Sequence, residues 1–301
     1  MATARGFAFV DGVFSSLAEA RVPITDRGFL FADSVFETVR TYQRKPFLLG
    51  DHLDRLRRSA DTLQIPVPWS DQHFGEVVAG LLSRGAQQAE AVLRIMVTRG
   101  DGGHGLAFPE PQRSRLVVFS RPLPALDSVL YREGVKVVLP EAARHKGQAV
   151  PADVKSGSYL AAVLALAEAR LSGGFEALLR ASDGAVSEAT TSNVFVVRDG
   201  VLMTPGLSDH ILPGITRALV LSIARSRDLK IVEEPIYESS LLSADEVFLT
   251  SSIKEVLPVN SVGDKAVGSD CPGPITVILM DAFAAQVEVL SRRGVARLSE
   301  L

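Results

Sequence analysis

The sequence lacks several features that would indicate an extracellular, membrane or nucleic-acid-binding protein. It has one cysteine, Cys271, among 301 residues, so no disulfide can form within the chain and we expect a reducing, cytoplasmic location. The net charge is −3, without the basic stripe that nucleic-acid binding needs. Apolar stretches are short or interrupted by charges, and charged residues appear early in the chain. We therefore expect neither a membrane span nor a signal peptide.

Two motifs suggest functions that their contexts argue against. Cys271 lies in a turn (Ser-Asp-Cys-Pro-Gly-Pro) with no neighbouring base, so we expect no nucleophilic role. Residues 100–105 match the glycine pattern Gly-x-Gly-x-x-Gly of dinucleotide sites. That pattern must open a helix, whereas Pro109 and Pro111 follow here and no helical periodicity appears. We expect no bound dinucleotide and no metal.

The length and the 47% hydrophobic content are those of an ordinary globular chain with two domains. Alternating and helical patterns predict mixed β-sheets with surrounding helices, an α+β class. We expect a small domain over 1–120, a linker over the proline-containing segment 121–128, and a large domain over 129–301. The predicted strands are 7–10, 13–15, 35–42, 92–98, 116–120, 135–139, 176–180, 194–197, 201–203, 229–232, 246–250 and 256–259. The predicted helices are one capped by Asp51 and ending before Pro66, then 158–171, 215–227, 239–243 and 274–291.

Lys155 and Glu188 together indicate chemistry with a carbonyl cofactor. A lysine amine forms Schiff bases with carbonyl groups, and a carboxylate can keep a pyridinium nitrogen protonated. Pyridoxal 5′-phosphate (PLP) needs both groups. Each residue alone is equally consistent with a solvated surface position, because lysine and glutamate are mostly exposed. Their order along the chain, with a phosphate-binding segment after them, favours the cofactor.

That segment is the start of the predicted helix near residue 215. Gly214, Ile215 and Thr216 place unpaired backbone N–H groups and the positive end of a helix dipole where an anion binds well. Ser252, after a predicted strand, can add a hydroxyl and an N–H group. An arginine could add a bidentate contact. The residues alone leave Arg55, Arg57 and Arg58 as equal candidates.

Strand 35–42 predicts one wall of a substrate site. Its alternation places Phe36, Thr38, Arg40 and Tyr42 on one face, and Glu37, Val39 and Thr41 on the other. An aromatic ring, a hydroxyl and an arginine on one face suit an amino acid with an apolar or acidic side chain. Arg94 lies among apolar residues, where a charge is costly unless it is paired. An internal salt bridge is the alternative explanation for Arg94.

The chain resembles the class IV aminotransferases, the fold-type IV PLP enzymes. This group includes branched-chain aminotransferases, D-amino acid aminotransferases and aminodeoxychorismate lyases. The resemblance extends from about Asp11 to Phe283. It is carried by 26–37 (Asp-Arg-Gly-Phe-Leu-Phe-Ala-Asp-Ser-Val-Phe-Glu), 52–56 (His-Leu-Asp-Arg-Leu), Lys155, 187–195, 212–217 (Leu-Pro-Gly-Ile-Thr-Arg) and 245–252. It implies two domains with PLP between them, and a homodimer.

The resemblance also assigns roles to individual residues. It implies Lys155 as the Schiff-base lysine, Glu188 at the pyridine nitrogen and Arg55 at the phosphate. Further expected cofactor contacts are Tyr159, Gly214, Ile215, Thr216, Ser251 and Ser252. Expected substrate contacts are Phe31 of the neighbouring subunit, Phe36, Thr38, Arg40, Arg94 at the α-carboxylate, His104, Ser252 and Ile253.

The expected function is transfer of an amino group between a branched-chain-like L-amino acid and a 2-oxo acid such as 2-oxoglutarate. A D-amino acid or (R)-amine transaminase and an aminodeoxychorismate lyase are the alternatives. Leu106 departs from the Arg-x-His pair typical of D-amino acid enzymes, and Leu212-Pro213-Gly214 lacks the asparagine typical of lyases. Thr38 matches a lyase threonine. A binding protein without activity is disfavoured, because Lys155, Glu188 and Arg55 are all retained.

Overall fold

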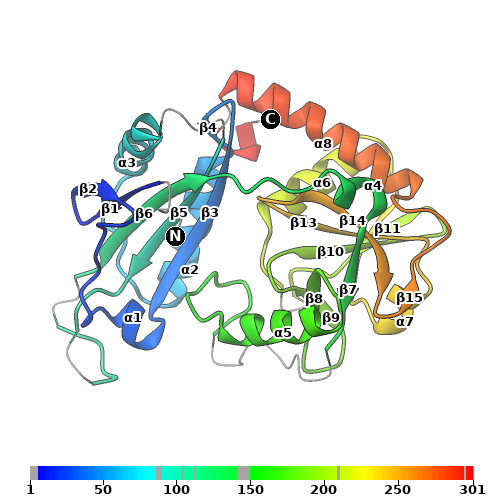
Figure 1. Ribbon diagram of the computed structural model, residues 1–301, viewed down its shortest axis with the longest axis horizontal. Helices are drawn as coiled ribbons and strands as arrows, with labels where there is room; N and C mark the ends of the chain where they lie inside the picture. Colours follow the sequence, from blue (N-terminus) through cyan, green and yellow to red (C-terminus); the bar gives the residue numbers. More distant parts are fainter. Residues whose placement is uncertain are drawn as a thin grey trace. The chain divides into compact units, whose positions relative to one another are not determined.

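The computed structural model describes residues 6–85, 90–102, 105–110, 113–140, 150–208, 211–294 and 296–300. The chain divides into two compact units (Figure 1). Unit 1 comprises 1–124, 154–158 and 288–301, and unit 2 comprises 125–153 and 159–287. The division at 124/125 falls inside the segment 121–128 that we predicted as the linker. Two later pieces nevertheless return to unit 1, so single boundaries at 120 and 129 do not describe the chain.

Unit 1 is built on an antiparallel six-stranded sheet in the order β2-β1-β6-β5-β3-β4. Alternating apolar residues of β3 and β5 are fully buried, among them Val35, Val39, Leu93 and Ile95. The strands are β1 (Phe7–Val10), β2 (Val13–Ser16), β3 (Ser34–Tyr42), β4 (Lys45–Pro46), β5 (Ala91–Thr98) and β6 (Arg115–Pro122). Strand β6 includes Arg121 and Pro122, which pair with Val92 and Ala91, so the linker prediction began two residues too early.

The helices of unit 1 pack on this sheet, α2 on β3 and α3 on β1 and β6. They are α1 (Arg27–Phe31), α2 (Leu49–Thr62), α3 (Asp71–Arg84) and the 3-10 turn η1 (Leu298–Glu300). The sequence analysis missed α1 and α3. The predicted cap Asp51 was wrong: α2 begins after Leu48, which has left-handed backbone angles, and Asp51 accepts a hydrogen bond from Leu298 N at 2.8 Å.

Unit 2 contains a mixed nine-stranded sheet in the order β12-β11-β10-β13-β14-β7-β8-β9, with β15 paired to β14. Pairs β11/β12, β14/β7 and β7/β8 are parallel. Its core includes Val137, Leu178, Val194, Val196 and Leu257. The strands are β7 (Val135–Val138), β8 (Glu176–Arg180), β9 (Val186–Ala189), β10 (Asn193–Arg198), β11 (Val201–Thr204), β12 (Ile231–Glu233), β13 (Glu246–Ser251), β14 (Glu255–Val262) and β15 (Lys265–Ala266).

The remaining helices are α4 (Val129–Glu133), α5 (Leu160–Leu171), α6 (Ile215–Arg225), α7 (Glu238–Leu242) and α8 (Pro274–Arg293). Helix α8 is long and apolar enough, by length and composition, to cross a membrane, contrary to our expectation. Its buried residues Leu279, Ala282, Phe283, Val287 and Leu290 recur at helical spacing. A single apolar stripe is typical of a helix packed on a protein core.

Candidate active site

The backbone of Lys155 is held at the edge of β3, a strand that lies more than a hundred residues before it in the chain. Phe36 N donates to Lys155 O at 2.9 Å, and Gly157 N donates to Ser34 O at 2.8 Å. Lys155 N donates to Ser59 Oγ of α2 at 3.1 Å. These bonds to a buried strand and its covering helix fix the lysine backbone within unit 1.

The face of β3 that we predicted to line the substrate site lies next to this lysine. The Nζ of Lys155 lies 4.8 Å from the centre of the Phe36 ring, and the Arg94 guanidinium lies 3.3 Å from the same centre. Arg94 is the cross-strand partner of Thr38, and its Nη1 donates to Thr38 Oγ1 at 3.3 Å. An amine and a guanidinium therefore lie close to one aromatic ring, and a hydroxyl contacts the guanidinium, an arrangement suited to an amino acid.

Arg40 lies on the same face of β3, two residues beyond Thr38. Its guanidinium is 4.4 Å from the centre of the Tyr42 ring. Arg94 and Arg40 therefore contact rings that lie six residues apart on the strand. Lys155 shares its ring with Arg94.

The opposite face of β3 carries Glu37, which is fully buried against α2. Arg55 donates to it from Nε and Nη2, each at 2.7 Å, and His52 Nδ1 lies 2.7 Å from Glu37 Oε2. Burial alone would raise the pKa of Glu37, but the charge and hydrogen bonds of Arg55 hold that pKa below its usual range. Burial lowers the pKa of His52, despite the opposing hydrogen bond with Glu37. The cluster is thus a buried ion pair joined to a neutral imidazole.

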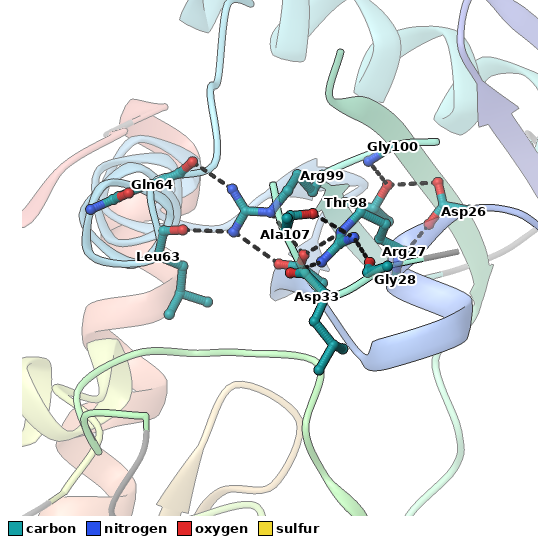
Figure 2. A network of polar contacts seen from close by, with 12 residues as sticks. Asp26, Arg27, Gly28, Asp33, Leu63, Gln64, Thr98, Arg99, Gly100 and Ala107 are labelled. Carbon is teal, nitrogen blue, oxygen red and sulfur yellow. Dashed lines mark hydrogen bonds and ion pairs between the residues drawn. The ribbon is translucent and has the colours of Figure 1, made fainter. Parts of the chain in front are cut away.

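A second polar network joins α1 to the loop at 105–107 (Figure 2). Asp33 accepts hydrogen bonds from Arg27 Nε at 2.9 Å and from Arg99 Nε and Nη2 at 2.8 and 3.0 Å. Arg27 also donates to the carbonyls of Gly105, Leu106 and Ala107, and Arg99 donates to those of Leu63 and Gln64.

Two aromatic rings that remain partly exposed lie on these arginines. Phe31 lies 5.0 Å from the Arg27 guanidinium and is 40% exposed, and Phe108 lies 3.8 Å from that of Arg99 and is 48% exposed. The network thus gives the surface around Phe31 a rigid support. His104, a predicted substrate contact, lies outside the described residues.

In unit 2, the carboxylate of Glu188 lies beside the segment that leads into α6. Glu188 is on β9 and only 5% exposed. Its Oε2 accepts from Leu212 N at 3.1 Å and from Asn193 Nδ2 at 3.4 Å, and Asn193 Nδ2 also donates to Leu212 O at 3.0 Å. A buried carboxylate held in this way is a suitable partner for a ring nitrogen.

The start of α6 has the features of an anion site. Gly214 is its N-cap, and no side chain caps the first turn. A Cβ on Gly214 would lie 1.9 Å from Asn193 Oδ1, so a larger residue would displace the Asn193 side chain that contacts Glu188. The helix has eleven residues, and Thr216 in its first turn is buried. Its N–H groups and dipole favour a phosphate.

The other predicted contacts of unit 2 lie in short connections. Ser251 ends β13 and its Oγ accepts from Lys254 N at 3.2 Å, while Ser252 and Ile253 follow in the turn to β14. Tyr159 is the N-cap of α5. Cys271 takes no part: burial, with the Glu246 carboxylate nearby, raises its pKa to about 11, so the thiol stays protonated near neutral pH.

Sequence reasoning did not identify Glu37, His52, Ser59 or Asn193 as site residues. His52 and Asn193 lie inside the motifs that carried the resemblance, so their positions were a usable signal. Glu37 was placed on the correct face of β3, but nothing local showed that Arg55 would meet it. Ser59 gave no signal, because its partner is distant in the chain.

The groups in each unit fit the parts of PLP. Unit 1 offers an amine held on β3 and an arginine, and unit 2 offers a buried carboxylate and a helix start capped by glycine. Among the described residues, no group of three or more His, Cys, Asp or Glu side chains could hold a metal ion.

Comparisons with known proteins agree with this chemistry. A relative from Methanocaldococcus jannaschii, named provisionally as a branched-chain-amino-acid aminotransferase, is 34% identical over 91% of this chain and 94% of its own. The D-alanine aminotransferase of Bacillus licheniformis is 32% identical, covering 88% of this chain and 92% of its own.

Among solved structures, the Escherichia coli branched-chain amino acid aminotransferase superposes with a TM-score of 0.87 at 29% identity, covering 93% of both chains. The 4-amino-4-deoxychorismate lyase of Pseudomonas aeruginosa gives a TM-score of 0.80 at 29% identity, covering 92% of this chain and 98% of its own. The amino-transferase class IV family model matches residues 34–262. The two-unit α+β fold is thus that of the fold-type IV enzymes, and the chain belongs to the class IV aminotransferases.

Proposed function

We propose that this protein is a PLP-dependent aminotransferase that moves an amino group between an amino acid and a 2-oxo acid. Branched-chain L-amino acids and 2-oxoglutarate are the proposed substrates. The observation that carries the proposal is the placement of Lys155 and Arg94 against one ring, Phe36. A base and a carboxylate-binding group that share one ring support this proposal.

When bound, PLP supplies an aldehyde that captures the amino group and a cationic ring that withdraws electrons from the α-carbon. Lys155 would bind the aldehyde, and its Nζ would take the proton from the substrate α-carbon. Glu188 keeps the ring nitrogen protonated. Arg94 holds the α-carboxylate, and Arg40 receives the distal carboxylate of an acidic substrate. Arg55 and the first turn of α6 hold the phosphate.

The experiment is reconstitution of the purified protein with PLP, followed by borohydride reduction and peptide mass spectrometry. We expect a visible absorbance band that borohydride removes, with the cofactor fixed at Lys155. Lys155→Ala should lose the band and essentially all turnover. Lys45→Ala, which removes an exposed lysine of the same unit, is the matched control. A wild-type protein that binds no PLP would refute the proposal.

Thr38 favours a second candidate, an aminodeoxychorismate lyase on the same fold. Its hydroxyl lies on the Phe36 face and contacts Arg94, where it could assist proton transfer. A panel of both enantiomers of leucine, valine, alanine and glutamate, with primary (R)-amines, would establish the amino donor. Pyruvate release from aminodeoxychorismate would identify the lyase. We expect amino transfer from L-leucine to 2-oxoglutarate to be faster than either alternative.

The exposed apolar surface around Phe31 supports the proposal of a homodimer, and the single cysteine supports the proposal of a cytoplasmic location. Phe29, Leu30 and Phe31 of α1 are exposed, as are Leu106 and Phe108, and Arg27 binds both segments. Exposed apolar groups gathered in this way mark interaction sites. In the proposed dimer, Phe31 reaches the site of the neighbouring subunit. Sedimentation velocity should give twice the 32.2 kDa chain mass, and Phe29→Asp should produce a monomer.

A further inference from the structure

The buried cluster of Glu37, His52 and Arg55 has a specific geometry. Glu37 receives the Nε and Nη2 edge of Arg55 through its two oxygens, and each bond measures 2.7 Å. The Glu37 side chain has no exposed area, and those of His52 and Arg55 are exposed by only 2% and 5%. Two parallel bonds to one carboxylate fix the plane of a guanidinium, and therefore the direction of Nη1.

The cluster is tied to the lysine through the same two elements. Arg55 and Ser59 are four residues apart on α2, so they lie on one face of the helix, one turn apart. Ser59 accepts the backbone N–H of Lys155, and Phe36, adjacent to Glu37 on β3, donates to the Lys155 carbonyl. Movement of Arg55 relative to Lys155 would break several of these bonds. A cofactor that carries its aldehyde and its phosphate-bearing group on neighbouring ring carbons requires such a fixed relation.

We propose that Glu37 is a positioning residue that turns Arg55 toward the cofactor phosphate, and that His52 holds Glu37 in place. The inference rests on the proposed function, in which Arg55 binds the phosphate of PLP. Arginine has many rotamers, and ordering one of them on binding would cost affinity. The buried carboxylate imposes this order before the cofactor arrives. Burial of a charge pair is otherwise a poor source of stability, so a positioning role explains why the pair is placed here.

The test compares PLP with pyridoxal, which has the aldehyde and ring but no phosphate. The Kd of each is measured by titrating the visible band of its adduct with Lys155, and the ratio Kd(pyridoxal)/Kd(PLP) reports the phosphate contact alone. In Glu37→Gln, an amide NH₂ replaces an oxygen that accepts from Arg55 or His52, so one donor must turn away. We expect the ratio to fall about 10- to 100-fold, the range expected for loss of one charge-assisted hydrogen bond.

Two further variants separate positioning from a general loss of structure. Asp33→Asn is the matched control, because Asp33 is a carboxylate of the same unit that bridges two arginines. In this variant the ratio should stay within about twofold of wild type, which is the usual error when the effects of two mutations are added. In an Arg55→Gln background, Glu37→Gln should cause no further fall, because its effect acts through Arg55. If Glu37→Gln does not fold, His52→Leu removes only the supporting hydrogen bond and should lower the ratio several-fold.

The outcomes distinguish this inference from the proposed function. A wild-type protein that forms no adduct with PLP contradicts the proposed function itself. If the wild type binds PLP but Glu37→Gln weakens PLP and pyridoxal equally, or leaves both unchanged, Glu37 has no positioning role. Tighter PLP binding by Glu37→Gln would also overturn the inference, because Glu37 would then be a counter-ion competing with the phosphate.

Discussion

Arg40 and Arg94 lie on one face of the sheet but at different distances from the lysine, and this predicts different effects of removing each. Arg94 contacts the ring that Lys155 also contacts, whereas Arg40 contacts Tyr42, six residues further along β3. At about 3.3 Å per residue, the Cα atoms of Phe36 and Tyr42 are roughly 20 Å apart along the strand, so Arg40 must turn from Tyr42 toward Thr38 to reach a substrate held at Arg94. The α-carboxylate is bonded to the carbon that Lys155 must reach, so it belongs with Arg94. Arg40 is left for the distal carboxylate of glutamate or 2-oxoglutarate.

The size of the Arg40 effect follows from its present contact. A charge-assisted hydrogen bond contributes about 1.5–3 kcal/mol. Arg40 must leave the Tyr42 ring to make it, which costs about 0.5–1 kcal/mol at a partly exposed site. The net contribution is about 0.5–2.5 kcal/mol, so Arg40→Ala should weaken glutamate and 2-oxoglutarate roughly 2- to 70-fold. Leucine has no distal carboxylate and should be unaffected.

The assay is stopped-flow measurement of each half-reaction with leucine and with glutamate. Arg94→Ala should weaken both substrates about 10- to 150-fold, because both carry an α-carboxylate. Arg44→Ala, which removes an arginine just beyond the end of β3, is the control for a general loss of charge and should leave both half-reactions unchanged. Equal losses for leucine and glutamate in Arg40→Ala would refute the division of roles.

Three further predictions concern other residues. Glu188→Gln should retain PLP but slow the half-reaction with leucine roughly 10²- to 10³-fold, because a positioned electrostatic contact is lost; stopped-flow rates equal to wild type would make Glu188 purely structural. Arg99→Met should lower the free energy of unfolding by about 3–5 kcal/mol, because it breaks a buried ion pair. Arg292→Met, at an exposed ion pair, should change the free energy of unfolding by about 0–1 kcal/mol. Urea denaturation measures both changes. Because burial lowers the pKa of His52 below 6.5 in the folded state, the unfolded chain binds this proton first. The contribution of His52 to the free energy of unfolding should therefore be fully present above that pH. It should be lost on acidification, by at most about 1.4 kcal/mol per pH unit. His52→Asn keeps a hydrogen-bond donor but cannot titrate, so the free energy of unfolding should depend less on pH between about pH 6.5 and 5. An unchanged dependence on pH would contradict this account.

Elements with strong local patterns were predictable from the sequence. The alternation in β3 correctly placed Phe36 and Thr38 on the face opposite Glu37, because side chains in a strand point to alternate sides whatever covers them. The long helices α5, α6 and α8 followed from their periodicity. Helix α1, of five residues, and strand β9, of four residues, were both missed. Helix α3 was also missed, although Ser70 caps it with a hydrogen bond to His73 N.

The sequence alone also determined the family and the candidate chemistry, because the motifs around Lys155, Glu188 and Gly214 each occupy a short stretch of chain. It could not show that residues 154–158 join the edge of β3, or that residues 288–301 return to unit 1. Those contacts join segments far apart in the chain, and their partners are chosen by packing rather than by local pattern. For the same reason, only the tertiary structure showed that Arg55 meets Glu37 and that Arg94 shares a ring with Lys155. A buried charge needs a partner close to it, and the fold determines which residues lie close enough.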